Sequence, residues 1–191
     1  MSDALEFGHP VHATHLVVCC IDHRCTDDLQ SVMPGIIKDP AGNDWDLYDL
    51  IALPGASLGP MQREYKSWRK AFWSQLKVAL SLHTHIRTIV VADHLHCGAY
   101  KKLYLGYESD MVAAHEHITR SFSEEVKSRH PGIKVERWLL TPTPKSDLNW
   151  QAKNLDTTEV VIPCRDHFCE VAPTTSPGGK KRRRRLKHQP R

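Results

Sequence analysis

The sequence predicts an α/β fold with a largely parallel central β-sheet flanked by helices. Short, β-branched apolar runs alternate with longer helical patterns along the chain, as in strand-helix-strand units. Several of these runs are apolar at nearly every position, which is typical of strands that are buried on both faces of a parallel sheet. Ligands of such sheets bind at the carboxyl ends of the strands, so residues that follow the predicted strands are the first candidates for function.

The first half of the chain supplies two strands and a helix. Residues 15–21 form an apolar run that ends at a polar segment, and residues 47–53 form a second run that the Pro54-Gly55 turn stops. Residues 61–83 contain no Gly or Pro. Large apolar side chains recur there every fourth residue, at Trp68, Phe72, Leu76 and Leu80. We therefore expect a helix whose apolar face packs on the sheet.

The second half continues the alternation. Residues 88–92 predict a third buried strand, residues 111–129 a long helix and residues 134–140 a fourth strand. Residues 141–157 are polar and rich in turn-forming residues, and residues 159–162 predict one more edge strand.

Composition predicts one domain followed by a basic tail. With 191 residues, 40% hydrophobic and 25% charged, the chain is long enough for one hydrophobic core. We expect a single domain over residues 1–172 and a disordered tail over residues 173–191. The tail holds eight basic residues and no acidic one, so the formal charge of +4 leaves the rest of the chain at about −4. A weak, salt-sensitive contact with a polyanion is therefore expected only through the basic run 180–187.

The cysteines are expected to be thiols or metal ligands. No apolar run approaches the roughly 18 residues of a membrane span, and the first twenty residues do not resemble a secretory signal, so we expect a cytoplasmic protein with no membrane partner. In that compartment, six cysteines in a chain of this size favour thiol chemistry over disulfides.

Two short motifs follow two of the predicted strands. Cys20-x-Asp22-x-Arg24 follows the first, and His94-x-x-Cys97-Gly98 follows the third. Two thiolates and one imidazole suit Zn²⁺, and three ligands leave tetrahedral zinc one open position for a water whose pKa falls to about 7. We therefore assign Cys20, His94 and Cys97 as the ligands of one zinc ion, with hydroxide attack on a small electrophilic carbon as its natural reaction.

Asp22 and Arg24 are the predicted catalytic residues. On an extended segment they would project toward the same cleft as Cys20. Arg24 would keep the Asp22 carboxylate ionised and oriented, and Asp22 would accept a hydrogen bond from the zinc-bound hydroxide. A further hypothesis is that Asp22, once released by Arg24, binds the zinc itself and closes the site.

Both motifs are complete signatures of the β-carbonic anhydrases, which the chain resembles over residues 14–140. Residues 46–56 resemble the second strand and following loop of that family, and residues 88–99 its zinc-binding strand and loop. The resemblance implies zinc-dependent, reversible hydration of carbon dioxide to bicarbonate and a proton. It also implies assembly as homodimers or multiples of dimers.

Three features depart from the family pattern. The chain before Cys20 is short, whereas family members usually carry an N-terminal helical arm that embraces the partner subunit. Residues 31–45 are expected to form an inserted loop near the cleft, which would reshape the substrate pocket. Asp93 and His96 lie in a loop that is often small and neutral in the family, and this bears on the proton-transfer route.

Alternatives to this function stay open. The same scaffold hosts hydrolysis of carbon disulfide or carbonyl sulfide, and the motifs do not separate these substrates from carbon dioxide. The chain could also be a non-catalytic, zinc-stabilised domain that its tail tethers to a polyanion. Such a closed site would need a fourth ligand, for which Asp22, His96 or Cys25 could serve.

The other cysteines and histidines receive no role. Cys164-x-x-His167-x-Cys169 could form a second metal site or a redox pair, although we interpret these cysteines as unliganded thiols. Cys19 is expected to point into the core as a small apolar side chain. The remaining candidates, expected to face solvent, are His23, His115 and His117.

Overall fold

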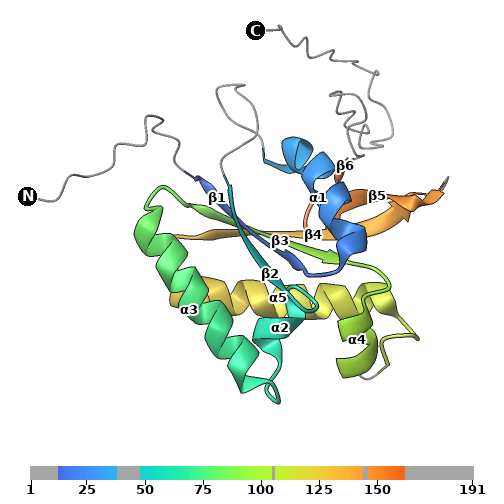
Figure 1. Cartoon of the computed structure of the whole chain (residues 1–191), viewed down its shortest axis with the longest axis horizontal. Helices are drawn as coiled ribbons and strands as arrows, with labels where there is room; N and C mark the ends of the chain where they lie inside the picture. Colours follow the sequence, from blue (N-terminus) through green and yellow to red (C-terminus); the bar gives the residue numbers. More distant parts are fainter. Residues whose placement is uncertain (1–12, 38–47, 105, 144–145, 162–191) are drawn as a thin grey trace, which may run out of the picture.

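The computed structural model describes residues 13–37, 48–104, 106–143 and 146–161, in which the strands form a six-stranded sheet (Figure 1). The strands are β1 (His15–Cys20), β2 (Tyr48–Leu53), β3 (Thr88–His94), β4 (Lys134–Thr143), β5 (Ser146–Asn154) and β6 (Val160–Val161). Their order in the sheet is β2-β1-β3-β4-β5-β6. Strands β1 to β4 are parallel, while β5 and β6 are added antiparallel. This confirms the predicted fold class.

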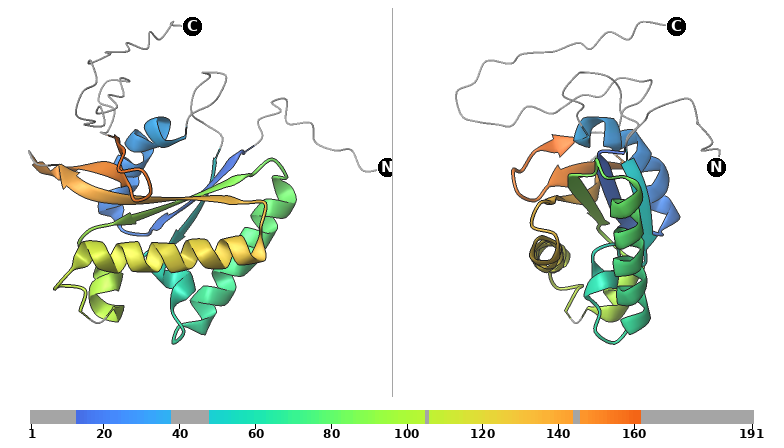
Figure 2. Two further views of the ribbon diagram at one scale, coloured as in Figure 1. Left: turned by 180° about the vertical axis from the view of Figure 1, so that it is seen from behind. Right: turned by 90° about the vertical axis from the view of Figure 1, so that its left-hand side faces the viewer.

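Helices cover both faces of the sheet (Figures 1 and 2). Helix α1 lies on one face, and the other helices of the described residues lie on the opposite side. Their bounds are α1 (His23–Ile36), α2 (Leu58–Met61), α3 (Lys66–Leu82), α4 (Gly98–Leu103) and α5 (Met111–Arg129).

The core consists of two apolar layers, one on each face of the sheet. Between α1 and the sheet, Val32 and Met33 pack with strand residues such as Val17. On the other face, Phe72 of α3 and Phe122 of α5 meet edge to face, with ring centroids 5.4 Å apart. Each such side chain contributes about 1.5–3 kcal/mol by leaving water, which explains why the strands are apolar on both faces.

The topology brings the ends of β1 and β3 together. After β1 the chain passes through α1 to β2, and it then returns through α3 on the other face to β3. Helix α1 follows β1 on one face of the sheet, whereas α4 and α5 follow the neighbouring strand β3 on the opposite face (Figures 1 and 2). Such a switch point is where α/β sheets bind ligands. Cys20 ends β1 and His94 ends β3, so both motifs lie at this point.

One predicted loop is a helix. Residues 31–36, expected to belong to the inserted loop 31–45, form the second half of α1, and residues 38–45 lie outside the described residues. Pro34 and Gly35 suggested a loop, yet both lie inside the helix. A Cβ atom at Gly35 would lie 2.4 Å from Val161 Cγ1, so the glycine allows α1 to approach β6 closely.

Two other elements differ from expectation. Residues 146–154, expected to be part of a polar loop, form β5. Trp150 and Ala152 of this strand are buried, whereas Gln151 and Lys153, which alternate with them, are only partly buried. The helix expected over residues 61–83 begins only at Lys66, after the separate short helix α2. The predicted edge strand is confirmed as β6.

Several expectations fall outside the described residues. These are the basic tail 173–191 with its run 180–187, and the cluster of Cys164, His167 and Cys169. None of the described helices has both the length and the apolar composition that crossing a membrane requires.

Candidate metal site

Cys20, His94 and Cys97 lie together at the carboxyl ends of β1 and β3. All three are buried, and their ligand atoms lie within 4.8 Å of one another. Cys20 Sγ and Cys97 Sγ are 3.9 Å apart, and both residues are free cysteines. Two sulfurs bound at about 2.3 Å to a tetrahedral centre would be about 3.8 Å apart. The cluster therefore has the dimensions of a site with two cysteine ligands and one histidine ligand.

The imidazole of His94 presents an unused lone pair to this cluster. Its Nδ1 lies 2.9 Å from the carbonyl oxygen of Leu95. Because a carbonyl only accepts, Nδ1 carries the proton and Nε2 keeps its lone pair. Nε2 is buried and has no hydrogen-bond partner among the described residues. A buried, unpartnered nitrogen beside two sulfurs fits a metal ion.

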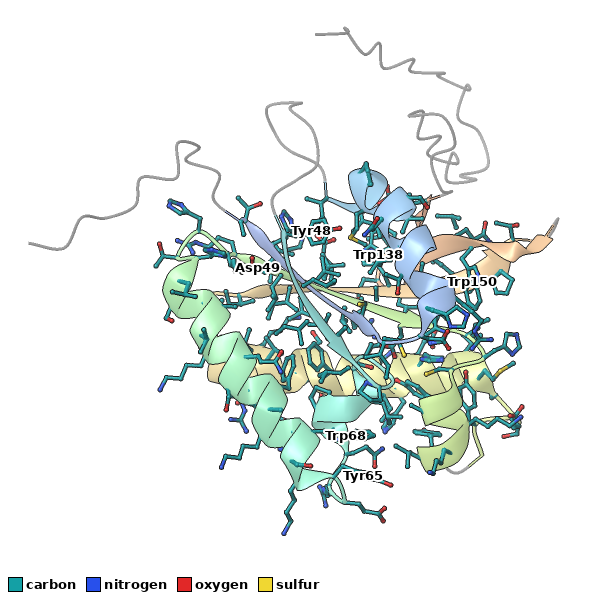
Figure 3. The ribbon with its side chains drawn as sticks, viewed as in Figure 1. Tyr48, Asp49, Tyr65, Trp68, Trp138 and Trp150 are labelled. Carbon is teal, nitrogen blue, oxygen red and sulfur yellow. The ribbon has the colours of Figure 1, made fainter. Side chains whose placement is uncertain are left out.

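An aromatic neighbour of the His94 imidazole comes from β5. The ring of Trp150 stands edge-on to His94, with ring centroids 5.8 Å apart. Trp150 and Trp138 both belong to the apolar layer that α1 covers (Figure 3). The indole thus closes the α1 side of the histidine, a contact that the sequence analysis missed because β5 was expected to be a loop.

A hydrogen bond joins the two candidate thiol ligands, whose sulfurs are 3.9 Å apart. The hydrogen bond from Cys97 lowers the pKa of Cys20, and the same hydrogen bond raises the pKa of Cys97. The Gly55 N–H also donates to Cys20 Sγ, at 3.3 Å. Cys97 is the N-cap residue of α4, and backbone N–H groups at the start of that helix partly offset the rise in its pKa.

Asp22 lies at the edge of the cluster, where it begins a helix. It is the N-cap residue of α1 and accepts a hydrogen bond from the Arg24 backbone N–H at 3.0 Å, so the expected extended segment is wrong. The side chain of Arg24 also binds the carboxylate, and these hydrogen bonds lower the pKa of Asp22 to about 2. Asp22 Oδ2 lies 3.9 Å from His94 Nε2, which places the carboxylate next to the cluster.

Arg24 also joins the two motifs. Its Nη2 donates to the carbonyl oxygen of His96, at 3.2 Å. The backbone of His96 has a φ of 57°, in the left-handed region that few residues other than glycine adopt. Strained backbone of this kind is concentrated at functional sites.

Other histidines and cysteines are distributed partly as expected. His23 and His117 are exposed and Cys19 is buried, as predicted. Burial raises the pKa of Cys19 to about 12, as expected of a thiol kept in the core. His96, a possible fourth ligand, is exposed.

His115 does not face solvent, contrary to expectation. It is fully buried, and its Nδ1 lies 2.9 Å from Asp93 Oδ2. Asp93 is itself a buried residue of β3, not a loop residue. The spacing of His115, Thr119, Phe122 and Val126 along α5 was a signal for this burial, because it places all four on one helical face.

The fold and this cluster define an α/β protein with a buried group of two cysteines and one histidine that could hold a metal ion. No family model matches the chain. An uncharacterized protein from Rickettsia bellii is 30% identical over 132 residues, covering 67% of this chain and 76% of the relative. An uncharacterized protein from Rickettsia conorii is 31% identical over 132 residues, covering 67% of each. The chain belongs to the same family as these two rickettsial proteins.

Solved structures with a similar arrangement are β-carbonic anhydrases. The β-carbonic anhydrase CcaA is 18% identical, with a TM-score of 0.41, over 80% of this chain and 84% of that one. The β-carbonic anhydrase CafA of Aspergillus fumigatus is 13% identical, with a TM-score of 0.39, over 76% of each chain. A tetrameric β-carbonic anhydrase from Sordaria macrospora is 14% identical, with a TM-score of 0.36, over 76% and 82%. The two motifs carry the resemblance of this chain to that family.

Proposed function

We propose that this chain is a zinc-dependent carbonic anhydrase, which interconverts carbon dioxide and water with bicarbonate and a proton. The observation that carries the proposal is the unpartnered Nε2 of His94, buried beside the sulfurs of Cys20 and Cys97. These three residues would hold one zinc ion. Zinc, when bound, lowers the pKa of a water molecule to about 7 and makes hydroxide available near neutral pH.

The carboxylate of Asp22 is suited to orient the nucleophile. With a pKa of about 2 it is ionised at neutral pH and is too weak a base to take up a proton there. It can instead accept a hydrogen bond from the attacking nucleophile and so fix the direction of its remaining lone pair. The proton that hydration releases must then pass to solvent or buffer.

Arg24 keeps the carboxylate in that position. Its Nε donates to Asp22 Oδ1 at 3.0 Å and its Nη2 to Asp22 Oδ2 at 2.6 Å. Paired, charge-assisted hydrogen bonds of this kind fix both distance and orientation. They also hold Asp22 as an acceptor for the nucleophile, which favours an open fourth position over a closed one.

Stopped-flow measurement of carbon dioxide hydration tests this function on protein whose zinc content is known. We expect turnover at one zinc per chain and none in Cys97→Ala. Asp22→Asn should keep its zinc and lose turnover by about 100-fold or more. The matched control is Asp110→Asn, because Asp110 is also an N-cap aspartate, at α5, where its side chain accepts the Ala113 N–H.

Two results would direct attention to other functions. Zinc-loaded protein that is inactive with carbon dioxide but hydrolyses carbon disulfide or carbonyl sulfide would show that the enzyme acts on those molecules instead. Zinc-loaded protein that is inactive with all three would support a non-catalytic zinc domain. One observation favours that second candidate: Asp22 Oδ2 is only 3.9 Å from His94 Nε2, so it could become a fourth ligand if Arg24 released it.

Assembly and polyanion contact are separate proposals. Homodimers or multiples of dimers are tested by sedimentation of the full chain. A polyanion contact is tested by heparin binding at increasing salt, with and without residues 178–191.

A further inference from the structure

A buried group of polar side chains lies behind the candidate metal site. It is centred on Asp93, which like His115 is fully buried. Oδ1 of Asp93 accepts the Ser57 N–H at 3.1 Å. Oδ2 accepts hydrogen bonds from Ser57 Oγ at 2.7 Å, from Tyr100 OH at 2.6 Å and from His115 Nδ1 at 2.9 Å. Burying a carboxylate is costly, and these donors offset that cost.

Asp93 does not belong to the ligand cluster. It precedes His94 directly on β3, and successive residues of a strand point to opposite faces of the sheet. His94 therefore turns toward the two sulfurs, while Asp93 turns toward α5. Any effect of Asp93 on the site must pass through other residues.

One route from Asp93 leads to the backbone of Cys97. The Cys97 N–H can only donate, so Tyr107 Oη accepts it, at 3.2 Å. The single proton of Tyr107 is then free to donate to His115 Nε2, also at 3.2 Å. His115 in turn donates from Nδ1 to Asp93. Each donor in this series of hydrogen bonds is used once, and the series ends at the Asp93 carboxylate.

A second route leads to Cys20. Asp93 holds both the N–H and the hydroxyl of Ser57. Ser57 follows Gly55 and Ala56, whose φ angles of 73° and 46° are both in the left-handed region. Ala56 is strained there, so the surroundings must hold this turn in place. The same turn directs the Gly55 N–H to Cys20 Sγ, at 3.3 Å.

We propose that Asp93 is a positioning residue for the metal site, acting on Cys97 through His115 and Tyr107 and on Cys20 through Ser57. This inference rests on the metal site of the proposed function. It explains how two sulfurs on different segments are held 3.9 Å apart. Hydrogen-bonding partners beyond the ligands commonly change metal affinity by 10–100-fold when they are removed.

The test removes one hydroxyl group from the route between Asp93 and Cys97. Tyr107→Phe breaks the link between His115 and the Cys97 N–H. The matched control is Tyr104→Phe, because Tyr104 packs against the same core. Cd²⁺ affinity is measured on the full chain by competition with a chelator, together with the ¹¹³Cd chemical shift. We expect about tenfold weaker binding and a shifted resonance in Tyr107→Phe, and a change of no more than about twofold in Tyr104→Phe.

Amide hydrogen exchange in the metal-free protein is the second measurement. The Cys97 amide should exchange faster in Tyr107→Phe than in Tyr104→Phe. Equal Cd²⁺ affinities, equal ¹¹³Cd shifts and equal exchange rates in the two variants would overturn the proposal. So would a Tyr107→Phe variant that is less stable but binds Cd²⁺ like the wild type, because its role would then be structural only.

The outcomes separate this inference from the proposed function. Wild-type protein that binds Cd²⁺ with the expected difference between the variants, but whose zinc form does not hydrate carbon dioxide, would overturn the proposed function and support the positioning role. Wild-type protein that binds neither Zn²⁺ nor Cd²⁺ would overturn both.

Discussion

Arg24 holds the carboxylate of Asp22 with two side-chain hydrogen bonds, 3.0 Å from Nε to Oδ1 and 2.6 Å from Nη2 to Oδ2. Both residues lie at the first turn of α1, and the same guanidinium reaches the carbonyl oxygen of His96 in the second motif. Arg24 therefore orients the Asp22 carboxylate beside the candidate metal ligands and joins the segment after β1 to the segment after β3.

The first prediction concerns the titration of Asp22. Because Arg24 lowers the pKa of Asp22 to about 2, the pair stabilises the folded, metal-free protein above the unfolded-state pKa of about 3.9, and this contribution is lost as the pH falls through about 2. Since Arg24 is 45% exposed, we expect only about 1 kcal/mol from the pair. Arg24→Gln should raise the Asp22 pKa toward its ordinary value, as measured by carboxyl ¹³C NMR.

The control for this titration is Arg129→Gln. Arg129 has a similar exposure of 47% and pairs with Glu125 on α5, away from the site. It should leave the Asp22 titration unchanged. An Asp22 pKa near 4 in the wild-type protein would show that the ion pair is not formed in solution.

The second prediction concerns the stability that metal confers. Zinc at about 100 times its dissociation constant should raise the free energy of unfolding by about 2.7 kcal/mol, and a chelator should remove this gain. Cys20→Ala should lose the gain. Cys19→Ala should keep it, because Cys19 is the buried neighbour that is not in the ligand cluster. Denaturant unfolding with and without zinc measures both, and equal gains in the two variants would contradict the assigned ligand set.

The third prediction concerns the protons released when metal binds. The hydrogen bond between the two thiols lowers the pKa of Cys20 and raises the pKa of Cys97, so we expect one thiolate and one thiol in the metal-free protein at neutral pH. Metal binding near pH 6, below the pKa of about 7 of a zinc-bound water, should therefore release about one proton, so the affinity should rise about tenfold per pH unit there. Isothermal titration calorimetry in buffers of different ionisation enthalpy counts these protons. Release of two would mean that both thiols are protonated in the metal-free protein.

The fourth prediction concerns the contact between α1 and β6. Gly35→Ala would place a Cβ atom 2.4 Å from Val161 Cγ1, so we expect a loss of about 1–3 kcal/mol in the free energy of unfolding. Gly132→Ala is the control, because a Cβ there meets nothing within 4 Å. Adding Val161→Ala to Gly35→Ala should relieve the clash, so the double variant should lose less stability than the sum of the two single losses. Losses that simply add would contradict the proposed contact.

Local patterns were sufficient for the fold class and for the cluster that could hold a metal. An apolar strand and a helical face are repeats within one segment, so β1, β3 and α5 could be predicted from their own residues. The sequence motifs follow the first and third predicted strands, and a parallel sheet brings the carboxyl ends of its strands to one edge. Cys20, His94 and Cys97 could therefore be grouped in advance, and the structure places them together.

Local patterns failed where a distant contact decides the conformation. Pro34 and Gly35 suggested a loop, but packing of α1 against β6 keeps them helical. The alternation of Trp150 and Ala152 with polar residues is short, and β5 forms by pairing with β4 and β6. His115 was expected at the surface although its helical spacing with Thr119 and Phe122 indicated burial, and its partner Asp93, 22 residues away, could not be identified from the sequence.

Apolar periodicity and motif spacing act over a few residues, so the order of the residues alone predicts the α/β fold and a set of candidate ligand residues. The folded chain adds three features: Asp22 begins a helix beside His94, the His94 Nε2 lone pair has no hydrogen-bond partner among the described residues, and Asp93 lies behind the site. These features depend on hydrogen bonds and packing between segments far apart in the chain, and they form only when the segments are brought together in the folded protein.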